Sequence, residues 1–453
     1  MITNVLNAYI GDSSVSRLYQ GDQLIYDAVH PDILCTYMSN GDSSTTPDVY
    51  FNTGVVPDFT VKVETKYSCS TNTTSKGLFG SRGSSSNSRY FVYTYASVSV
   101  SGQSFNTAKF WCRNAEGYSA IVPTINEPHV LTTYLTYTSA SSATEVNCIL
   151  DSSLTSKGIT VSSGIDSSVE MYMFAVNYDG TVNYRASEDT RIYYMKIWRD
   201  NNLIRFYIPV LHWLNGQYVP CFYDKVNDNY IYNLGTDTPT YKIQGDYLLD
   251  YLGAQPETAI PTTATTNIRY DSGVYPSINL QTDIRSRSNY GTENYILGSA
   301  TDNTTTPTWQ SYSLGCPGKL EQLRFSHAAH ANGTATTTLT TVGTEITSVN
   351  TISAYYTSEG YIRCYFNGEN KNNGTTPITI FPPNTIHLFS RHGNSQNTNP
   401  ARGSRIYYIN FTTSNIPTKT YVPVLHNNQA AFLDLNTNTY IYNLGTDTPS
   451  YSF

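Results

Sequence analysis

The chain has 453 residues, enough for two or three domains, and only 13% of them are charged. Ordinary soluble domains carry about 25% charged residues, so a highly charged disordered chain and a protein of long surface helices are both excluded. The net charge is −7, and no two Lys or Arg residues are adjacent. Because no basic run is present to neutralise phosphates, we expect no nucleic acid partner.

The first 30 residues form a separate short unit. Tyr9-Ile10-Gly11-Asp12 and Tyr19-Gln20-Gly21-Asp22 recur ten residues apart, followed in register by Val15 and Ile25. Each motif predicts a strand, a Gly-Asp turn and a second strand. A unit of this size is marginal alone, so it either completes a sheet on a neighbouring protein or subunit, or folds against its own chain. Under the first alternative, the attachment residues are Tyr9, Ile10, Val15, Tyr19 and Ile25.

Targeting signals and cysteine pairs are not visible in the sequence. The start of the chain lacks the basic and apolar regions of an export signal, and no stretch reaches the roughly 18 to 20 apolar residues of a membrane helix. The seven Cys residues are never closer than 34 positions, which excludes paired-Cys metal sites and argues against a disulfide scaffold. We expect buried or free thiols, synthesis in a reducing cytosol and no membrane insertion.

The strongest signal is an internal duplication. The decapeptide from Tyr230 to Pro239 recurs unchanged from Tyr440 to Pro449, and Pro209 to His212 returns as Pro423 to His426. The second copy lacks four residues between these two blocks. We therefore predict three units: an N-terminal β unit at 1–30, a first copy at 31–243 and a second copy at 246–453, with Gln244-Gly245 as a short joint.

Both copies show the periodicity of strands. Phe59, Val61, Val63 and Thr65 alternate with Thr60, Lys62, Glu64 and Lys66, which predicts one face in the core and the other in water. Further short runs rich in Tyr, Val, Ile and Thr are separated by Gly, Asn, Asp and Ser. The only segment with a helical period is 246–252. The fold class is all-β: two tandem antiparallel β-sandwiches, jelly rolls, preceded by the short β unit.

Catalytic and metal motifs are weak. Polysaccharide cleavage on such a sandwich needs two carboxylates about 5 to 5.5 Å apart, and no strand here places acids on one face at a spacing of two. His327 and His330 lack a nearby acidic or Cys partner, so we interpret them as loop histidines. His212 and His426 occupy equivalent positions, which a hydrogen-bonded histidine at a strand end explains. We expect no catalytic residue and no metal or other cofactor, with Asn177 and Asp179 as the weak candidates for calcium.

Aromatic and amide side chains are the usual components of a glycan site. Trp111, Trp198, Trp213 and Trp309 are available beside 40 Tyr, although core or subunit contacts account for most such rings. Trp213 and Tyr218 flank the loop in the region where the second copy is shorter. With Asn215 they are our glycan-binding candidates.

The motifs resemble a known family. They are a Tyr-x-(Asp/Asn)-(Thr/Ser)-Gly-Val-x-Pro opening at Tyr50 to Pro57, displaced at Arg269 to Pro276, then Phe79 to Arg82, Arg191 to Ile197, Tyr207 to Val210, Phe222 to Val226 and Tyr232 to Gly235. The pattern resembles the laminin-G-like or concanavalin-A-like jelly rolls of surface and virion proteins in gut Bacteroidota and their phages. The leader turns resemble short leaders of phage head or tail fibres. The second copy departs at Ile296 to Ser299 and Phe432 to Asp434, which weakens the case for a shared ligand.

The resemblance implies a non-enzymatic structural protein on a phage virion surface, displaying two lectin-like domains to host or mucosal glycans. It also implies synthesis in the bacterial host cytoplasm. Its partners would be other virion structural proteins, further copies of itself in a homo-oligomer, and a cell-surface glycan. The alternatives are a capsid decoration or spacer that binds no glycan, and a polysaccharide-cleaving glycosidase.

Overall fold

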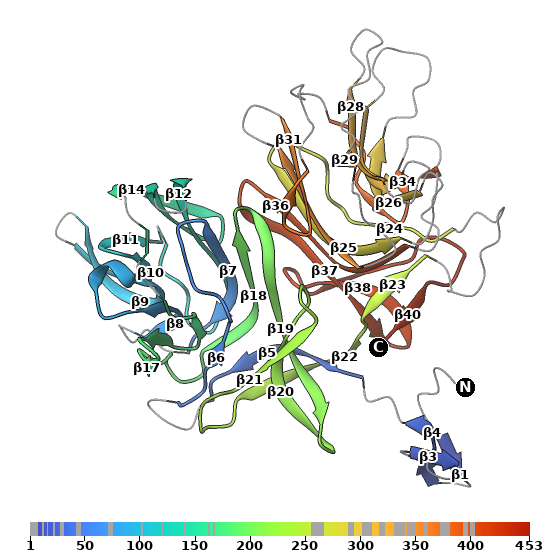
Figure 1. Cartoon of the computed structure of the whole chain (residues 1–453), viewed down its shortest axis with the longest axis horizontal. Helices are drawn as coiled ribbons and strands as arrows, with labels where there is room; N and C mark the ends of the chain where they lie inside the picture. The colour runs from blue at the N-terminus through green and yellow to red at the C-terminus, as the bar shows by residue number, and fades with distance from the viewer. Residues whose placement is uncertain are drawn as a thin grey trace.

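The computed structural model consists almost entirely of strands (Figure 1). It describes residues 8–10, 13–15, 17–20, 23–27, 31–41, 47–70, 76–100, 103–119, 121–139, 142–161, 164–165, 168–254, 267–288, 294–300, 310–316, 322–329, 340–341, 349–356, 361–371, 381–392, 397–398 and 404–453. In this part of the chain, no helix is long and apolar enough to cross a membrane.

The N-terminal unit forms the two hairpins that the Gly-Asp motifs predict. Strand β1 (Ala8–Ile10) pairs with β2 (Ser13–Val15), and β3 (Arg17–Gln20) pairs with β4 (Gln23–Asp27), both antiparallel. The closing pairs are Ile10 with Ser13 and Gln20 with Gln23, so each turn falls at its Gly-Asp. Tyr9, Ile10, Val15, Tyr19 and Ile25 lie on these strands, but their side chains are outside the described residues.

The first copy is a sandwich of two sheets. Its outer sheet contains β6 (Phe51–Asn52), β8 (Gly77–Arg82), β9 (Tyr90–Val100), β10 (Gln103–Cys112), β11 (Ala115–Tyr118), β15 (Tyr172–Met173), β16 (Val176–Tyr178) and β17 (Thr181–Asn183), with the 3-10 turn η1 (Ser86–Ser88) before β9. Its inner sheet contains β5 (Ile33–Ser39), β7 (Val61–Ser68), β12 (His129–Ser139), β13 (Ser142–Leu150), β14 (Ser153–Val161), β18 (Arg191–Arg199), β19 (Asn202–Leu214), β20 (Gln217–Asp224), β21 (Asn229–Tyr232) and the first part of β22 (Thr240–Leu248). Strand pairing within the sandwich is antiparallel except between β8 and β16.

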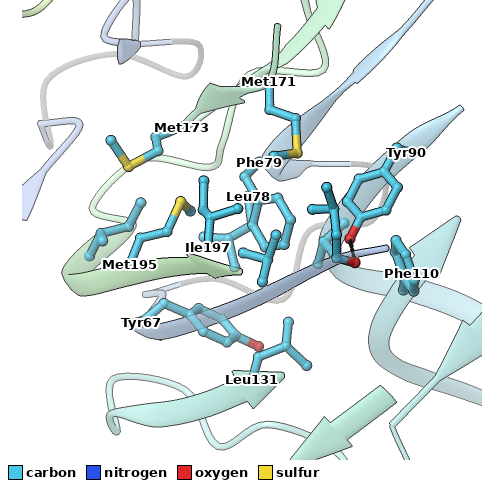
Figure 2. Close-up of a cluster of buried hydrophobic side chains, with 14 of the residues drawn as sticks. Tyr67, Leu78, Phe79, Tyr90, Phe110, Leu131, Met171, Met173, Met195 and Ile197 are labelled. Atoms are coloured by element: carbon cyan, nitrogen blue, oxygen red, sulfur yellow. Dashed lines mark hydrogen bonds between the residues drawn. The ribbon is translucent and has the colours of Figure 1, made fainter. Parts of the chain in front are cut away.

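The core of the first copy lies between these two sheets. Tyr90 and Phe110 of the outer sheet belong to one buried cluster with Ile197 and Met195 of the inner sheet, and Leu78 and Phe79 lie between the two pairs (Figure 2). The Tyr90 hydroxyl donates to the Val61 carbonyl at 2.9 Å, which satisfies a polar group inside an apolar core. The alternation along each strand thus places every second side chain in this core.

The second copy repeats the arrangement. Its outer sheet contains β24 (Tyr270–Asp271), β26 (Asn294–Ala300), β27 (Gln310–Cys316), β28 (Gln322–Ala329), β29 (Thr340–Thr341), β33 (His387–Leu388), β34 (Arg391–His392) and β35 (Asn397–Thr398). Its inner sheet contains β23 (Tyr251–Gly253), β25 (Leu280–Ser288), β30 (Asn350–Tyr356), β31 (Ile362–Phe366), β32 (Glu369–Asn370), β36 (Ser404–Thr413), β37 (Ile416–His426), β38 (Gln429–Asp434), β39 (Thr439–Tyr442) and β40 (Ser450–Ser452). The expected all-β fold of two tandem antiparallel sandwiches is therefore confirmed. The helical period at 246–252 was misleading, because this segment forms the end of β22 and the start of β23.

The repeated decapeptide is a structural turn. Asn233 accepts from the backbone N–H of Tyr50 at 3.0 Å, and its equivalent Asn443 accepts from that of Arg269 at 2.9 Å. A Cβ on Gly235 would lie 1.7 Å from the Asp48 carbonyl oxygen, so only glycine allows this close approach. A Cβ on the equivalent Gly445 would lie 1.6 Å from the Asn267 carbonyl oxygen. The turn fastens the start of each copy to its end, which explains why the motif is the same in both.

The inner sheets of the two copies meet along β22. Its first part pairs with β5 of the first copy, and Tyr247 and Leu248 pair with β37 of the second. Ile33 pairs with Tyr247, its own equivalent at the offset of 214, as expected for strands related by a pseudo-twofold axis. Gln244 and Gly245, the expected short joint, lie within β22, so the connection between the copies is a continuous strand. The division at 31–243 and 246–453 remains a prediction.

We call the packed surface between the two copies the seam. The prediction that Thr60, Lys62, Glu64 and Lys66 face water is wrong, since Lys62 is 6% and Glu64 1% exposed. This face of β7 packs against the second copy: the Lys62 ammonium lies 3.4 Å from Asn415 Oδ1, and Lys66 donates to the carbonyls of Leu435 and Asn436 at 2.8 Å. Burial lowers the pKa of both lysines. Strand β7 does have the predicted polar face, but this face contacts the second copy instead of water.

A third apolar cluster fills the seam with residues from both copies: Leu34, Tyr194, Trp198, Leu203, Phe206, Ile208, Val210, Cys221, Tyr223, Leu248, Tyr408, Val422, Val424, Ala431 and Leu433. Many are equivalent pairs, such as Tyr194 with Tyr408 and Val210 with Val424. Phe206 and Tyr408 meet edge to face at 5.5 Å across the seam. The copies therefore have separate cores and a shared one.

We predict that the seam makes stability pH-dependent through Lys225. This residue is buried, donates to the carbonyls of Leu249 and Asp250, and has its pKa lowered by burial to about 8. In the unfolded chain the pKa of lysine is about 10.4, so the unfolded state binds more protons between these values and stability rises with pH across that interval. Lys225→Leu copies Leu435, the equivalent residue, and removes this rise.

Urea unfolding of the wild type and Lys225→Leu at pH 7 and above pH 10 measures the effect. The stability of the wild type relative to the variant should increase with pH. A difference that stays constant over the range would contradict a lysine held below its ordinary pKa.

Candidate functional site

The hairpin of β19 and β20 carries the predicted glycan candidates. In the second copy, the equivalent hairpin closes with His426 opposite Gln429. In the first copy, His212 pairs with Val219 and two further rungs follow, Trp213 with Tyr218 and Leu214 with Gln217. The four extra residues thus lengthen the hairpin, and both aromatic candidates lie in the extension.

The extended hairpin ends in a tight turn. Asn215 and Gly216 have φ values of 52° and 90°, as a two-residue turn of the Asn-Gly type requires. The rings of Trp213 and Tyr218 contact edge to face with centroids 5.0 Å apart, and both are partly exposed. The Asn215 side chain is exposed at the tip. The structure therefore brings the three candidates together on one projecting hairpin.

Aromatic residues that the sequence analysis did not select continue this surface. Tyr247 on β22 is 43% exposed, and its ring lies 6.2 Å from that of Phe453, which in turn lies 5.9 Å from that of Tyr451 on β40. Burial, and then the charge of Tyr247, raises the pKa of Tyr218, which places Tyr247 near the hairpin. We call Trp213, Tyr218, Tyr247, Phe453 and Tyr451 the aromatic row.

The aromatic row crosses the seam, because Trp213 and Tyr218 belong to the first copy and the other three residues belong to the second. Ile243 and Tyr241 extend the exposed apolar surface along β22, at 48% and 42% exposure. Their equivalents at the offset of 210 are Phe453 and Tyr451. That repeat was visible in the sequence, but their exposure could not be predicted without knowing that β22 lies on the surface.

Polar groups are carried by the same hairpin and by β22. Gln244 donates from Nε2 to Asn438 Oδ1 at 3.0 Å and to the Tyr440 hydroxyl at 3.1 Å, while its Oε1 accepts from Thr36. Gln217 and Asn215 are exposed on the hairpin. Partly exposed rings with amides next to them match the chemistry of a sugar, which has apolar C–H faces and polar hydroxyls.

Two equivalent His–Asp–Tyr groups lie close to the row. His212 Nδ1 is 2.9 Å from Asp32 Oδ1, and the Tyr230 hydroxyl donates to Asp32 Oδ2 at 2.7 Å. In the second copy, His426 and Tyr440 contact Asp246 at 2.6 and 2.7 Å. In each group the imidazole stacks on the tyrosine, with centroids 3.9 and 4.0 Å apart. Each Asp thereby ties the beginning of its copy to the hairpin. His426 ends β37, as the strand-end interpretation expected, whereas His212 lies within β19, which continues to Leu214.

The calcium candidates are used within the protein fold. The Asn177 side chain is 4% exposed; its Oδ1 accepts from the Gly180 N–H at 2.9 Å and its Nδ2 donates to the Glu170 carbonyl at 2.8 Å. Asp179 follows at the exposed turn with φ of 50°. No group of three His, Cys, Asp or Glu residues within the described ranges is arranged to hold a metal ion.

Other sequence candidates lie elsewhere. His327 is within β28 rather than in a loop, opposite Tyr312, while its side chain, His330 and Trp309 are outside the described residues. Trp198 is fully buried in the seam, where Nε1 donates to Asp283 Oδ2 at 3.2 Å. Trp111 is partly exposed on the outer sheet of the first copy. Of the seven cysteines, the six with described side chains are buried free thiols, as expected. Burial raises the pKa of the Cys35 thiol to about 12.

Comparisons with known proteins add little. No protein family model and no curated protein sequence matches the chain. Among solved structures, the chain is similar to domains LG4-5 of the mouse laminin alpha1 chain, with 8% identity, a TM-score of 0.29, and coverage of 93% of this chain and 95% of that one. At so low a TM-score the likeness carries no argument, and the fold assignment rests on the strand pairing itself.

We predict that the two His–Asp–Tyr groups are structural and unequal. His426→Ala leaves Asp246, whose side chain is 2% exposed, with one hydrogen-bond partner fewer, which should cost about 1 to 3 kcal/mol of unfolding free energy. His212→Ala should cost less, because the Asp32 side chain is 12% exposed and water replaces the lost partner.

Chemical unfolding of both single variants and the double variant tests this. Equal stability of all three with the wild type would show that the histidines do not anchor the strands.

Proposed function

We propose that the protein is a non-enzymatic surface protein of a bacteriophage particle, a head fibre or tail fibre, that displays two lectin-like sandwiches to glycans on a host cell or in mucus. The aromatic row is the observation that carries the proposal. Five rings on one surface, two of them raised on a hairpin extension that only the first copy possesses, form an extended platform for sugar stacking.

The leader and the seam fit such a role. The two hairpins at 8–27 precede β5, whose start lies beside the extended hairpin, since the Tyr218 hydroxyl donates to the Pro31 carbonyl at 3.4 Å. An attachment unit there, holding the chain to other virion proteins or to further copies of itself, would support both sandwiches. The shared core at the seam keeps them in a fixed orientation. Many copies on one particle would convert weak single contacts into firm adhesion.

A spacer or capsid decoration without glycan binding is the second candidate. The seam favours it, because a continuous strand and a buried cluster between the copies suit a stiff strut as well as a display platform. Under this alternative the exposed rings of the aromatic row contact a neighbouring virion protein.

Placement on a particle is testable by electron microscopy. Particles that lack the protein, mixed with the purified full chain, should gain peripheral density, and the chain with residues 1–30 deleted should not restore it if the leader is the attachment unit. Particles that gain no density from the full chain would argue against a virion role.

Glycan adhesion is testable on an array with the full chain displayed multivalently. Trp213→Ala with Tyr247→Ala should lower binding by about tenfold or more, because stacking on large rings supplies most of the contact energy in such sites. Tyr275→Ala, which removes a ring that is 61% exposed elsewhere, is the matched control and should bind normally. No binding of the wild type to any glycan would favour the spacer.

A further inference from the structure

A second cluster of rings lies on the opposite side of the outer sheet of the first copy. Tyr90 and Phe110 point into the core in Figure 2. Their neighbours Phe91 and Trp111 therefore point away from it, since side chains alternate along a strand. These two residues are paired across β9 and β10, and together with Tyr93, Val176 and Tyr184 they form a separate apolar cluster.

The rings of this cluster lie side by side. Phe91 is stacked between Trp111, at 6.2 Å, and Tyr184, at 6.1 Å, with interplanar angles of 28° and 17°. Phe91 is 3% exposed, whereas Trp111 and Tyr184 at the two ends are partly exposed. We call the stack of Trp111, Phe91 and Tyr184 the ladder. Solvent reaches its two ends, whereas its centre at Phe91 is buried.

Cationic side chains surround the ladder. The Arg89 guanidinium lies 5.2 Å and the Lys109 ammonium 4.5 Å from the Trp111 ring. Arg82 donates to the Tyr184 hydroxyl at 3.2 Å and lies 5.0 Å from the ring of Tyr178. Both guanidinium groups are close enough to the Tyr93 hydroxyl to oppose the rise in its pKa that burial and Tyr184 cause. We call Arg82, Arg89, Lys109, Trp111 and Tyr184 the outer aromatic face.

Most of this positive charge is unpaired. Lys109 forms an ion pair with Glu116 at 2.6 Å. In the described part of the chain, neither Arg82 nor Arg89 has a carboxylate partner, although the protein as a whole carries a net charge of −7. Asp179 is exposed on the adjoining turn, where its N–H donates to the Arg82 carbonyl.

Three N–H donors of this face also lack a protein acceptor among the described residues: Nε of Arg82, Nε of Arg89 and Nε1 of Trp111, all inaccessible to solvent as atoms. Buried donors are almost always paired, so this face does not satisfy all of its own polar groups. Arg82 and Arg89 are themselves partly exposed, so their unpaired guanidinium charge is open to an anion, and guanidinium groups match a carboxylate in geometry and charge.

We propose that the outer aromatic face is a second binding site, for a carboxylate-bearing glycan such as a uronic-acid polymer. The sugar ring stacks on the accessible end of the ladder at Trp111, while its carboxylate accepts from Arg82 and Arg89. This inference rests on the proposed glycan adhesion and adds a substrate class and a location distinct from the aromatic row. It is specific to the first copy as far as the described residues show, because the strand positions equivalent to Arg82 and Arg89 carry no arginine in the second.

The test uses the full chain and immobilised polygalacturonate, hyaluronan and alginate fragments, each beside its carboxyl-reduced neutral form. The wild type should bind at least one acidic fragment about tenfold more tightly than the reduced form, which keeps the stacking surface but lacks the charge. Binding should weaken at high salt.

Four variants separate the sites. Arg89→Gln and Trp111→Phe should each lower acidic-fragment binding severalfold or more; the second keeps an aromatic ring at this position but reduces the indole face available for stacking. Lys371→Gln, which removes a positive charge in the second copy, and Trp213→Ala in the aromatic row should leave it unchanged. Thermal unfolding checks that each variant is folded.

The outcomes distinguish the two proposals. If only Arg89→Gln and Trp111→Phe lower binding of the acidic fragment, the outer aromatic face is supported as the second site. If Trp213→Ala lowers this binding instead, the second site is overturned, whereas glycan adhesion at the aromatic row is supported. Equal binding of acidic and reduced fragments, or binding of neutral glycans only, also overturns it, whereas failure to bind any glycan overturns both proposals.

Discussion

The arrangement of the two sandwiches depends on the hydrogen bonds of the Lys196 ammonium, which is buried at the centre of the seam. Its three donors are satisfied by three acceptors: Glu64 Oε1 at 2.9 Å from the first copy, and Asn410 Oδ1 and Thr420 Oγ1, both at 2.7 Å, from the second. A buried charge is tolerated only when it is paired and fully hydrogen-bonded. Both copies are therefore required to complete its surroundings. The apolar cluster around Lys196 supplies the buried apolar surface of the seam. The hydrogen bonds of Lys196 fix the position of one copy relative to the other.

Much of the fold could be predicted from the sequence, because duplication and period-2 patterns are local signals. The two leader hairpins, the all-β class and the buried thiols are confirmed. The burial of Lys62 and Glu64 could not be predicted, since alternation reports that a strand has a polar face without saying what covers it. The same limit applied to 246–252, where apolar spacing over seven residues is shared by helices and buried strands.

The candidate site was predictable only in part. Trp213 and Tyr218 were found because one copy is longer than the other there, and the structure shows that the extra length is two rungs of a hairpin. Tyr247, Tyr451 and Phe453 were missed, because only the register of β22 and β40 brings them to that surface. The outer aromatic face was missed for a related reason: Phe91, Trp111 and Tyr184 come from separate parts of the chain and carry no motif, and the motif from Phe79 to Arg82 does not indicate that Arg82 joins them.

The seam is close to a twofold interface, yet its polar centre is asymmetric. Lys196 lies opposite Asn410, its own equivalent, and Asp283 takes the place that Glu64 holds in the first copy. If two first copies from different chains paired in the same way, Lys196 would meet a second Lys196, and Phe206 would stand where Thr420 accepts. Two second copies would instead bring Asp283 close to Asp283 without any lysine. Each half is thereby matched to a half of the other kind, which opposes pairing between like halves of different chains.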